Sequence, residues 1–237
     1  MNSIIFDTET NKLNGDIIQA AYINIQIDDR EVSNDGSYYL KNFSTSEKID
    51  FEAMAVHNII PEDLKDCPPS NQCRIPSTTE YVIGHGIDYD IDALQRAGQF
   101  DPFMKRICTL AIMRYLYPQL KSHKLGVLCY QFSENLNDTR ELNKYSHNAL
   151  SDCYLTQLIV EHIVETQAIN TIDELHQLSE KARYPTHFYW GKFKGKKISD
   201  VESIGLIEIL NKESDLYVLT AIEEELYTRD QLELKLG

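Results

Sequence analysis

The stretch "IIFDTET", residues 4–10, places three large apolar residues directly before two acids that one threonine separates. A short apolar run of this kind predicts a buried β-strand. Because side chains alternate between the two faces of a strand, Asp7 and Glu9 would share one face and Thr8 would lie on the other. Neighbouring carboxylates repel, which raises their pKa values unless cations lie close by. The stretch therefore predicts either a cation site at the end of a core strand or a strand end at which Asp and Thr begin a turn.

The segments around this stretch predict an α/β protein. Apolar runs bounded by turn-rich segments predict three consecutive strands of a meander: residues 3–7, 17–27 and 37–43. The segment "YVIGHG", residues 81–86, predicts a fourth strand. Helical periodicity then predicts three longer helices: residues 105–117, 123–132 and 148–166. Strands that come first and helices that follow favour a mixed sheet with helices packed on it.

The pattern restarts near the C-terminus. Residues 61–80, with four prolines, predict a long surface excursion with at most one short helix. After residue 166 come a short helix candidate at 171–181 and the compact motif "HFYWGKFKGKKISDV", residues 187–201. We therefore expect one domain over residues 1–168 and a smaller one over 183–237.

A second acidic segment, "GHGIDYDIDAL", covers residues 84–94. If it is helical, Asp90 lies beside the apolar stripe of Ile87, Ile91 and Leu94, on the side closest to the core. A carboxylate there is costly unless a partner compensates it. Its neighbours Asp88 and Asp92 would share another face, which we interpret as solvated.

A third segment, "HNALSDCYLTQLIVEHI", covers residues 147–163 and predicts a strongly apolar helix. Asp152 stands among packing residues of this helix, and His147 precedes it. A histidine before a helix is free to face a cleft, although it is also a common surface or capping residue.

In this order and with these local spacings, the three acidic segments resemble the DEDD superfamily of 3′–5′ exonucleases, in the branch whose last motif is H-x-x-x-x-D (DEDDh). Asp7 and Glu9 match the D-x-E motif. Asp90 matches the second motif, with Tyr89 at the aromatic position, and His147 with Asp152 matches the last. The resemblance spans residues 3 to about 165, with a separate patch at 187–201. Gly86 departs from the pattern, because the family usually has Asn there.

The resemblance implies an α/β fold of the RNase H-like type, a mixed five-stranded sheet with helices on both faces, plus a small C-terminal α+β domain. It also implies a metal-dependent 3′–5′ exonuclease that releases mononucleotides from the 3′ end of DNA. Two ions per active site would be Mg²⁺ or Mn²⁺, which suit carboxylate ligands. The implied ligands are four acids: Asp7, which would bridge the ions, Glu9 and Asp152 at the ion that activates water, and Asp90 at the other.

His147 is the implied general base, because the ordinary histidine pKa of about 6.5 lies near working pH. Substrate contacts are implied for Thr8 and Tyr89. The segment "AMAVHNI", residues 53–59, resembles a family segment beside the 3′ nucleotide, which adds Met54 and His57. Leu13, just past the first motif, could press on a terminal base pair or be an ordinary exposed residue.

The tail motif contains "WGKFKGKK", residues 190–197, with four lysines among aromatic residues and glycines. Lys192, Lys194 and Lys196 could follow a phosphate backbone while Phe193 or Trp190 stacks on a base. The alternative is a small β-hairpin turn whose lysines only keep it soluble.

Composition bounds these expectations. The net charge of −14 argues against a nucleic-acid partner, unless metal ions neutralise some of the carboxylates. Five cysteines without a C-x-x-C pair predict reduced thiols and disfavour a zinc site. The first residues resemble neither a secretory signal nor a transmembrane helix, so we expect a cytoplasmic protein without a membrane partner.

Two alternatives to the DNA exonuclease stay open at this point. One is an exoribonuclease that trims short RNA, since sequence discriminates poorly between the two sugars. The other is a non-catalytic nucleic-acid-binding module on the same fold, which the presence of all four acids and the histidine disfavours.

Overall fold

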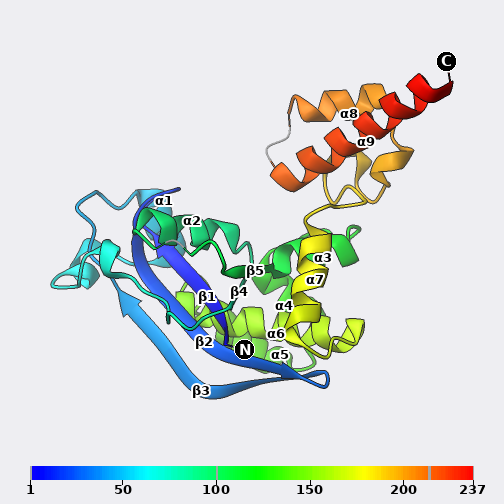
Figure 1. Ribbon diagram of the computed structural model, residues 1–237. Coiled ribbons are helices and arrows are strands. Elements are labelled where there is room, and N and C mark those ends of the chain that lie inside the picture. Colours follow the sequence, from blue (N-terminus) through cyan, green and yellow to red (C-terminus); the bar gives the residue numbers. More distant parts are fainter. Residues whose placement is uncertain (1, 100, 213–214, 237) are drawn as a thin grey trace. The chain divides into compact units, whose positions relative to one another are not determined.

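The computed structural model describes residues 2–99, 101–212 and 215–236, with side chains up to residue 232 (Figure 1). The chain forms two compact units. Unit 1 contains Met1–Leu110 and Lys124–Gln177, and unit 2 contains Ala111–His123 and Leu178–Gly237.

A mixed five-stranded sheet forms the centre of unit 1, as predicted. Its strands are β1 (Ser3–Thr10), β2 (Ile17–Asp28), β3 (Glu31–Asn42), β4 (Tyr81–Gly84) and β5 (Lys105–Cys108), in the order β3-β2-β1-β4-β5. The first three strands are antiparallel neighbours, which confirms the predicted meander, and β4 and β5 run parallel to β1. Strand β1 therefore lies inside the sheet: it pairs with β4 over Ser3–Ile5, and its C-terminal half continues along β2 alone.

Strand β5 corrects the predicted helix over residues 105–117. Lys105–Cys108 pair with β4, and the helix α3 (Thr109–Leu116) begins only after them. The residues Lys105–Cys108 are too few to show a period, and a short apolar run is compatible with a buried strand or a buried helix. Pairing with β4, for example Lys105 with Tyr81, decides in favour of the strand.

Helices cover both faces of the sheet (Figure 1). The long helix α6 (Ala149–Gln167) packs against β1, β2 and β3, and α2 (Asp88–Arg96) packs against β1. Three further helices of unit 1 are α1 (Phe51–His57), α4 (Leu125–Phe132) and α5 (Leu136–Asn143), and α7 (Ile172–Ala182) crosses from unit 1 into unit 2.

Helix α6 forms where the sequence combines a cap with a continuous apolar surface. The Asn148 side chain accepts a hydrogen bond from the Leu150 N–H at the start of the helix. The thiol of Cys153, fully buried, reaches the Ile5 and Ala21 carbonyls of β1 and β2 at 3.6 and 3.5 Å. Burial of each large aliphatic side chain of the helix contributes about 1.5–3 kcal/mol, so α6 is anchored on the sheet.

Two other predicted segments differ from the structure. The excursion over residues 61–80 contains two short 3₁₀ helices, Pro61–Leu64 and Ser70–Gln72, instead of at most one. Helix α5 was not predicted, because its sequence "LNDTRELN" has little apolar periodicity. Its signal is the cap residue Asn135, which accepts from the N–H groups of Asn137 and Asp138.

Unit 2 contains the helices α8 (Ser203–Leu210) and α9 (Leu216–Leu236) and two 3₁₀ helices, Gly191–Phe193 and Ile198–Asp200. Its buried core consists of Phe188, Tyr189, Ile198, Val201, Leu206, Val218 and Ile222. Between residues 187 and 197 the described chain forms one isolated β-bridge, His187 with Lys197, and not the two strands of a hairpin.

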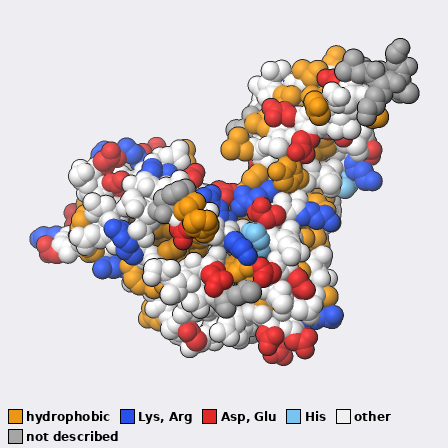
Figure 2. Space-filling model, in the orientation of Figure 1, with side chains coloured by type: hydrophobic (Ala, Val, Ile, Leu, Met, Phe, Trp, Pro, Cys, Tyr) orange, Lys and Arg blue, Asp and Glu red, His pale blue; other side chains and the backbone are white. Residues whose placement is uncertain are grey.

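Surface and thiol chemistry agree with the sequence expectations. Figure 2 shows acidic side chains gathered at the edge of unit 1 where the β2–β3 turn lies.

All five cysteines are free, which confirms the predicted reduced thiols. Within the described part of the chain, no helix combines the length and the apolar character that crossing a membrane requires.

Candidate active site

Asp7 and Glu9 lie near the C-terminal end of β1. They pair across the ladder with Ala21 and Gln19 of β2, and both are half-buried, while Thr8 between them is buried on the other face. The register of β1 and β2 shifts after Glu9, where the ladder becomes irregular. An irregularity of this kind bends the strand and changes the direction of nearby side chains. It can therefore direct the side chains at the end of a strand toward a site.

Asp90 is held against this strand end from the first turn of α2. It is 5% exposed, and its Oδ1 accepts hydrogen bonds from the Thr8 backbone N–H at 2.9 Å and from the Thr8 hydroxyl at 2.7 Å. Burial raises the Asp90 pKa to about 7, although the hydrogen bonds from Thr8 act in the opposite direction. Its neighbours face outward, Asp92 to solvent and Asp88 to Arg106 at 3.5 Å.

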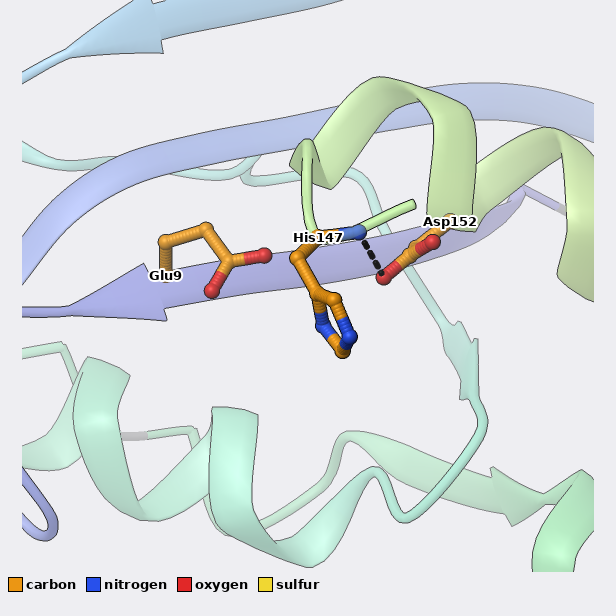
Figure 3. A group of neighbouring side chains, drawn as sticks. All are labelled: Glu9, His147 and Asp152. Carbon is orange, nitrogen blue, oxygen red and sulfur yellow. Dashed lines mark hydrogen bonds between the residues drawn. The ribbon is translucent and has the colours of Figure 1, made fainter. Parts of the chain in front are cut away.

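Asp152 and His147 come to the same place from the start of α6. The Asp152 Oδ2 accepts a hydrogen bond from the His147 backbone N–H at 3.3 Å, and His147 has a left-handed φ of 65°. This turn leaves the imidazole exposed between two acids: Figure 3 shows the carboxylates of Glu9 and Asp152 on either side of it. One ligand atom from each of the three residues lies within 4.8 Å of the other two.

The four carboxylates disturb one another strongly. Burial raises the pKa of Asp7 well above its ordinary value, and the charges of Asp90, Glu9 and Asp152 raise it further. Burial, followed by the charges of Asp152 and Asp90, raises the pKa of Glu9 to about 9. The pKa of Asp152 is raised to about 6 by burial, against the lowering effect of His147.

This donor set fits hard divalent cations. Carboxylate oxygens are the ligands that Mg²⁺ and Mn²⁺ prefer, and a cation among four acids would remove the repulsion that raises their pKa values. The distant segments singled out by the sequence are thus brought together in unit 1, at one end of β1.

The predicted substrate-contact residues of unit 1 surround this end of the strand in different ways. The Tyr89 hydroxyl shares a hydrogen bond of 2.5 Å with the Thr10 hydroxyl. Leu13 is 81% exposed, whereas Met54 is half-buried on α1. His57 is buried: its Nδ1 accepts from the Ile59 N–H at 2.9 Å, and its Nε2 has no hydrogen-bond partner among the described residues.

Two further observations were not predicted. Gly86 has a φ of 97°, a conformation that favours glycine, so the residue that replaces the family's usual Asn suits its backbone. Gln19, the one polar residue in the apolar run Ile17–Ile23, accepts through Oε1 a hydrogen bond from the Ala149 N–H at 2.9 Å. It joins β2 to the first turn of α6, where Asp152 lies.

Lys192, Lys194 and Lys196 lie in unit 2, within the tail motif. Lys192 donates to Glu208 Oε2 at 2.5 Å, so its charge already has a partner within that unit.

Comparison with known proteins agrees with this geometry. A family model described as an exonuclease, RNase_T, matches residues 4–160. The chain belongs to this exonuclease family. The match confirms the predicted DEDD superfamily of 3′–5′ exonucleases and the predicted enzyme class, a hydrolase of phosphodiester bonds.

Two relatives of this exonuclease, one found by sequence and one by structure, are themselves named as exonucleases. Exodeoxyribonuclease 10 of Escherichia coli (strain K12) is 28% identical over 200 residues, which cover 83% of this chain and 84% of that protein. The solved structure of Exonuclease X in complex with 5′ overhanging duplex DNA has a TM-score of 0.57 at 25% identity and covers 75% of this chain and 99% of that chain. The sequence itself also resembles exodeoxyribonuclease X, through "FDTET", "AMAVHNI", "RICTLAIMRYLYP", "HNALSDCYLT" and the tail motif "FYWGKFKGKKISDV".

A more distant structure shows the fold alone. Escherichia coli Exonuclease I in complex with a dA16 oligonucleotide has a TM-score of 0.55 at 15% identity and covers 74% of this chain and 42% of that chain. The predicted RNase H-like architecture of the exonuclease is thereby confirmed.

Proposed function

We propose that this exonuclease removes mononucleotides from the 3′ end of DNA, with two Mg²⁺ or Mn²⁺ ions and with His147 as general base. The observation that carries the proposal is the convergence of four carboxylates whose pKa values are raised, with a histidine between two of them. Such a set is costly without a compensating cation. The choice of DNA rests on the relatives named Exodeoxyribonuclease 10 and Exonuclease X.

Each acid has a distinct role in the proposal. Asp7 would bridge the two ions, Glu9 and Asp152 would hold one of them, and Asp90 would support the other. When bound, the ions supply charge stabilisation to the attacking and the leaving oxygen of an in-line displacement. Thr8 acts as a positioning residue, because its hydroxyl and its N–H fix the Asp90 carboxylate.

His147 would accept the proton of the attacking water. Its imidazole is exposed beside Glu9 and Asp152, within reach of a water that these acids position. The hydrogen bond from the His147 backbone N–H to the Asp152 carboxylate holds the backbone of the proposed base next to that acid. General-base catalysis of this kind contributes about 10²–10⁴-fold to a rate.

The remaining unit 1 residues would hold the substrate. Met54 and His57 on α1 would lie along the terminal nucleotide. Tyr89 would support the same side of the substrate site through its hydrogen bond to Thr10. Leu13, exposed next to the end of β1, would press on the terminal base pair of a duplex.

A digest of end-labelled oligonucleotides tests the function. With Mg²⁺ or Mn²⁺ we expect a 3′ label to leave at once as a mononucleotide and a 5′-labelled DNA to shorten progressively, with no reaction in chelator. Leu13→Ala should slow the digestion of duplex more than that of single strands. Early release of the 5′ label, or no DNA cleavage with either metal, would overturn the proposal. Faster digestion of matched RNA would favour the exoribonuclease alternative.

A further inference from the structure

The lysine-rich part of the tail motif is left without a role by the active site. Residues 186–197 contain four lysines and no acid, in a chain whose net charge is −14. They form the connection between α7 and α8 in unit 2 (Figure 1). A local excess of positive charge in an acidic protein is a feature that needs a partner of opposite charge.

The backbone of this connection is fixed by its own hydrogen bonds. The Phe188 N–H donates to Lys196 O at 3.0 Å, the Gly195 N–H to Phe188 O at 2.7 Å, and the Ile198 N–H to Thr186 O at 2.9 Å. Phe188 and Ile198 are buried in the core of unit 2 and anchor both ends. The segment therefore presents its lysines from a preformed loop, which lowers the entropy cost of binding an extended ligand.

A small pocket opens beside the loop. Its volume is 260 Å³, and its walls are Phe188, Trp190, Gly191, Lys192, Phe193, Glu208, Ile209 and Lys212. Pockets for drug-sized ligands have about 300–1,000 Å³, so this one suits a single ring system. Its lining combines apolar side chains with the charged side chains of Lys192, Glu208 and Lys212.

The two aromatic residues of the motif differ in what they can do. Phe193 is packed within unit 2. Its ring lies close to Gly205, where an added Cβ would be 3.2 Å from Phe193 Cζ, and the ring centroids of Phe193 and Phe188 are 5.8 Å apart. It is half-buried and forms part of the wall of the pocket. Trp190 lines the same pocket and is 39% exposed, so part of its side chain is accessible to a ligand.

The lysines differ as well. Lys192 and Lys212 both bind Glu208, at 2.5 and 3.0 Å, and hydrogen bonding to Lys192 is the main cause that lowers the Glu208 pKa to about 2. In contrast, no ion pair within the described residues involves Lys194, Lys196 or Lys197. Lys196 Nζ lies 5.8 Å from the Phe193 ring centroid, and no carboxylate of the described residues neutralises any of these three charges.

We propose that the loop and its pocket form a second DNA site, which binds a single strand. This site shares no residue with the active site. One unstacked base would lie on Trp190, while Lys194, Lys196 and Lys197 would contact the phosphates on either side. Stacking on an aromatic ring together with a positive track is the general chemistry of single-strand binding. This inference rests on the proposed function, since it identifies the strand as the DNA that the exonuclease digests.

Trp190 is the only tryptophan of the chain, so the intrinsic tryptophan fluorescence reports on this pocket alone. The experiment uses the full chain with Asp7→Asn, in chelator, titrated with an oligothymidylate of twelve nucleotides. We expect saturable quenching of the fluorescence. By anisotropy of a labelled oligonucleotide, Trp190→Ala should weaken binding roughly five- to a hundred-fold, while Trp190→Phe should keep most of it.

The lysines are tested by the salt dependence of the same binding. Each phosphate contact on a single strand contributes about 0.7 to the slope of log K against log salt, so the double variant Lys194→Ala, Lys196→Ala should lower the slope by about 1.4. Lys65→Ala, an exposed lysine of unit 1, is the matched control and should leave the slope unchanged.

Unchanged fluorescence at saturating DNA would overturn the inference, as would a Trp190→Ala variant that binds like the parent. The titration involves no turnover, so it is independent of the digest described above. A parent enzyme that fails to digest DNA refutes the proposed function, whereas absent quenching in an active enzyme refutes only the second site.

Discussion

Thr8 stands between two acids in the sequence and binds a third in the fold. Its side chain points away from Asp7 and Glu9, and its hydroxyl and N–H together fix the Asp90 carboxylate. Strand alternation therefore does more than place two acids on one face. It assigns the residue between them to hold the acid that arrives from α2.

At the same scale, His147 is the residue whose role can be separated most cleanly from binding. His147→Ala should lower kcat roughly 10²-fold or more, because the general base is lost while the four acids stay. Binding of DNA in Ca²⁺, measured by fluorescence anisotropy, should change little. His162→Gln, on the helix α6 that follows His147, should turn over like the parent. Parental turnover of His147→Ala would assign the proton transfer to another group.

The acids of the site could be predicted from sequence because the three acidic segments together resemble the family's motifs, and two of the acids also contradict their surroundings. Asp152 interrupts an apolar helix and Asp90 lies beside an apolar stripe, and a buried charge at such a place needs a partner. The supporting contacts could not be predicted. The hydrogen bond from Ala149 to Gln19 joins residues 130 positions apart, and nothing in either local pattern indicates it.

At the scale of elements, that hydrogen bond ties β2 to α6. Gln19→Leu would leave the buried Ala149 N–H without its acceptor, at a cost of about 1–3 kcal/mol. We expect a lower free energy of unfolding in urea and a loss in kcat larger than the change in KM, because the first turn of α6 carries Asp152. Gln26→Leu changes an exposed glutamine of the same strand and is the control. Equal effects of both variants would show that the hydrogen bond between Ala149 and Gln19 does not stabilise the site.

The elements themselves were predictable to different degrees. The meander of β1, β2 and β3 follows from apolar runs between turn-rich segments, and α6 follows from its long apolar surface. Strand β5 and helix α5 were missed for opposite reasons. The four residues of β5 are too short to show a period, and α5 is polar on most sides, so its cap at Asn135 is the main signal.

At the scale of the whole molecule, the net charge of −14 is not evidence against a nucleic-acid substrate. Four of the acids converge at the end of β1, where bound cations would compensate them, and the acid-free loop of unit 2 concentrates four lysines. The distribution of charge, and not its sum, is what a phosphate backbone would meet.

The raised pKa values also govern how stability depends on pH. An acid whose pKa is higher in the folded state binds more protons folded than unfolded, so stability falls as pH rises from the ordinary value toward the raised one. The ordinary values are 3.8 and 4.5, and the raised ones are about 6 for Asp152, about 7 for Asp90 and about 9 for Glu9. Metal-free protein should therefore lose stability between pH 4 and pH 9, and a bound cation should restore it.

Thermal unfolding with and without Mn²⁺, followed from pH 5 to pH 8.5, tests the convergence of the four acids on shared cations most directly. In chelator, Tm should fall with pH by about 5 °C or more. Mn²⁺ should raise Tm, more so at higher pH, and Asp7→Asn should reduce both effects, whereas Asp92→Asn, at an exposed acid, should not. A Tm that is independent of pH in chelator, and a response to Mn²⁺ that Asp7→Asn leaves intact, would contradict the account.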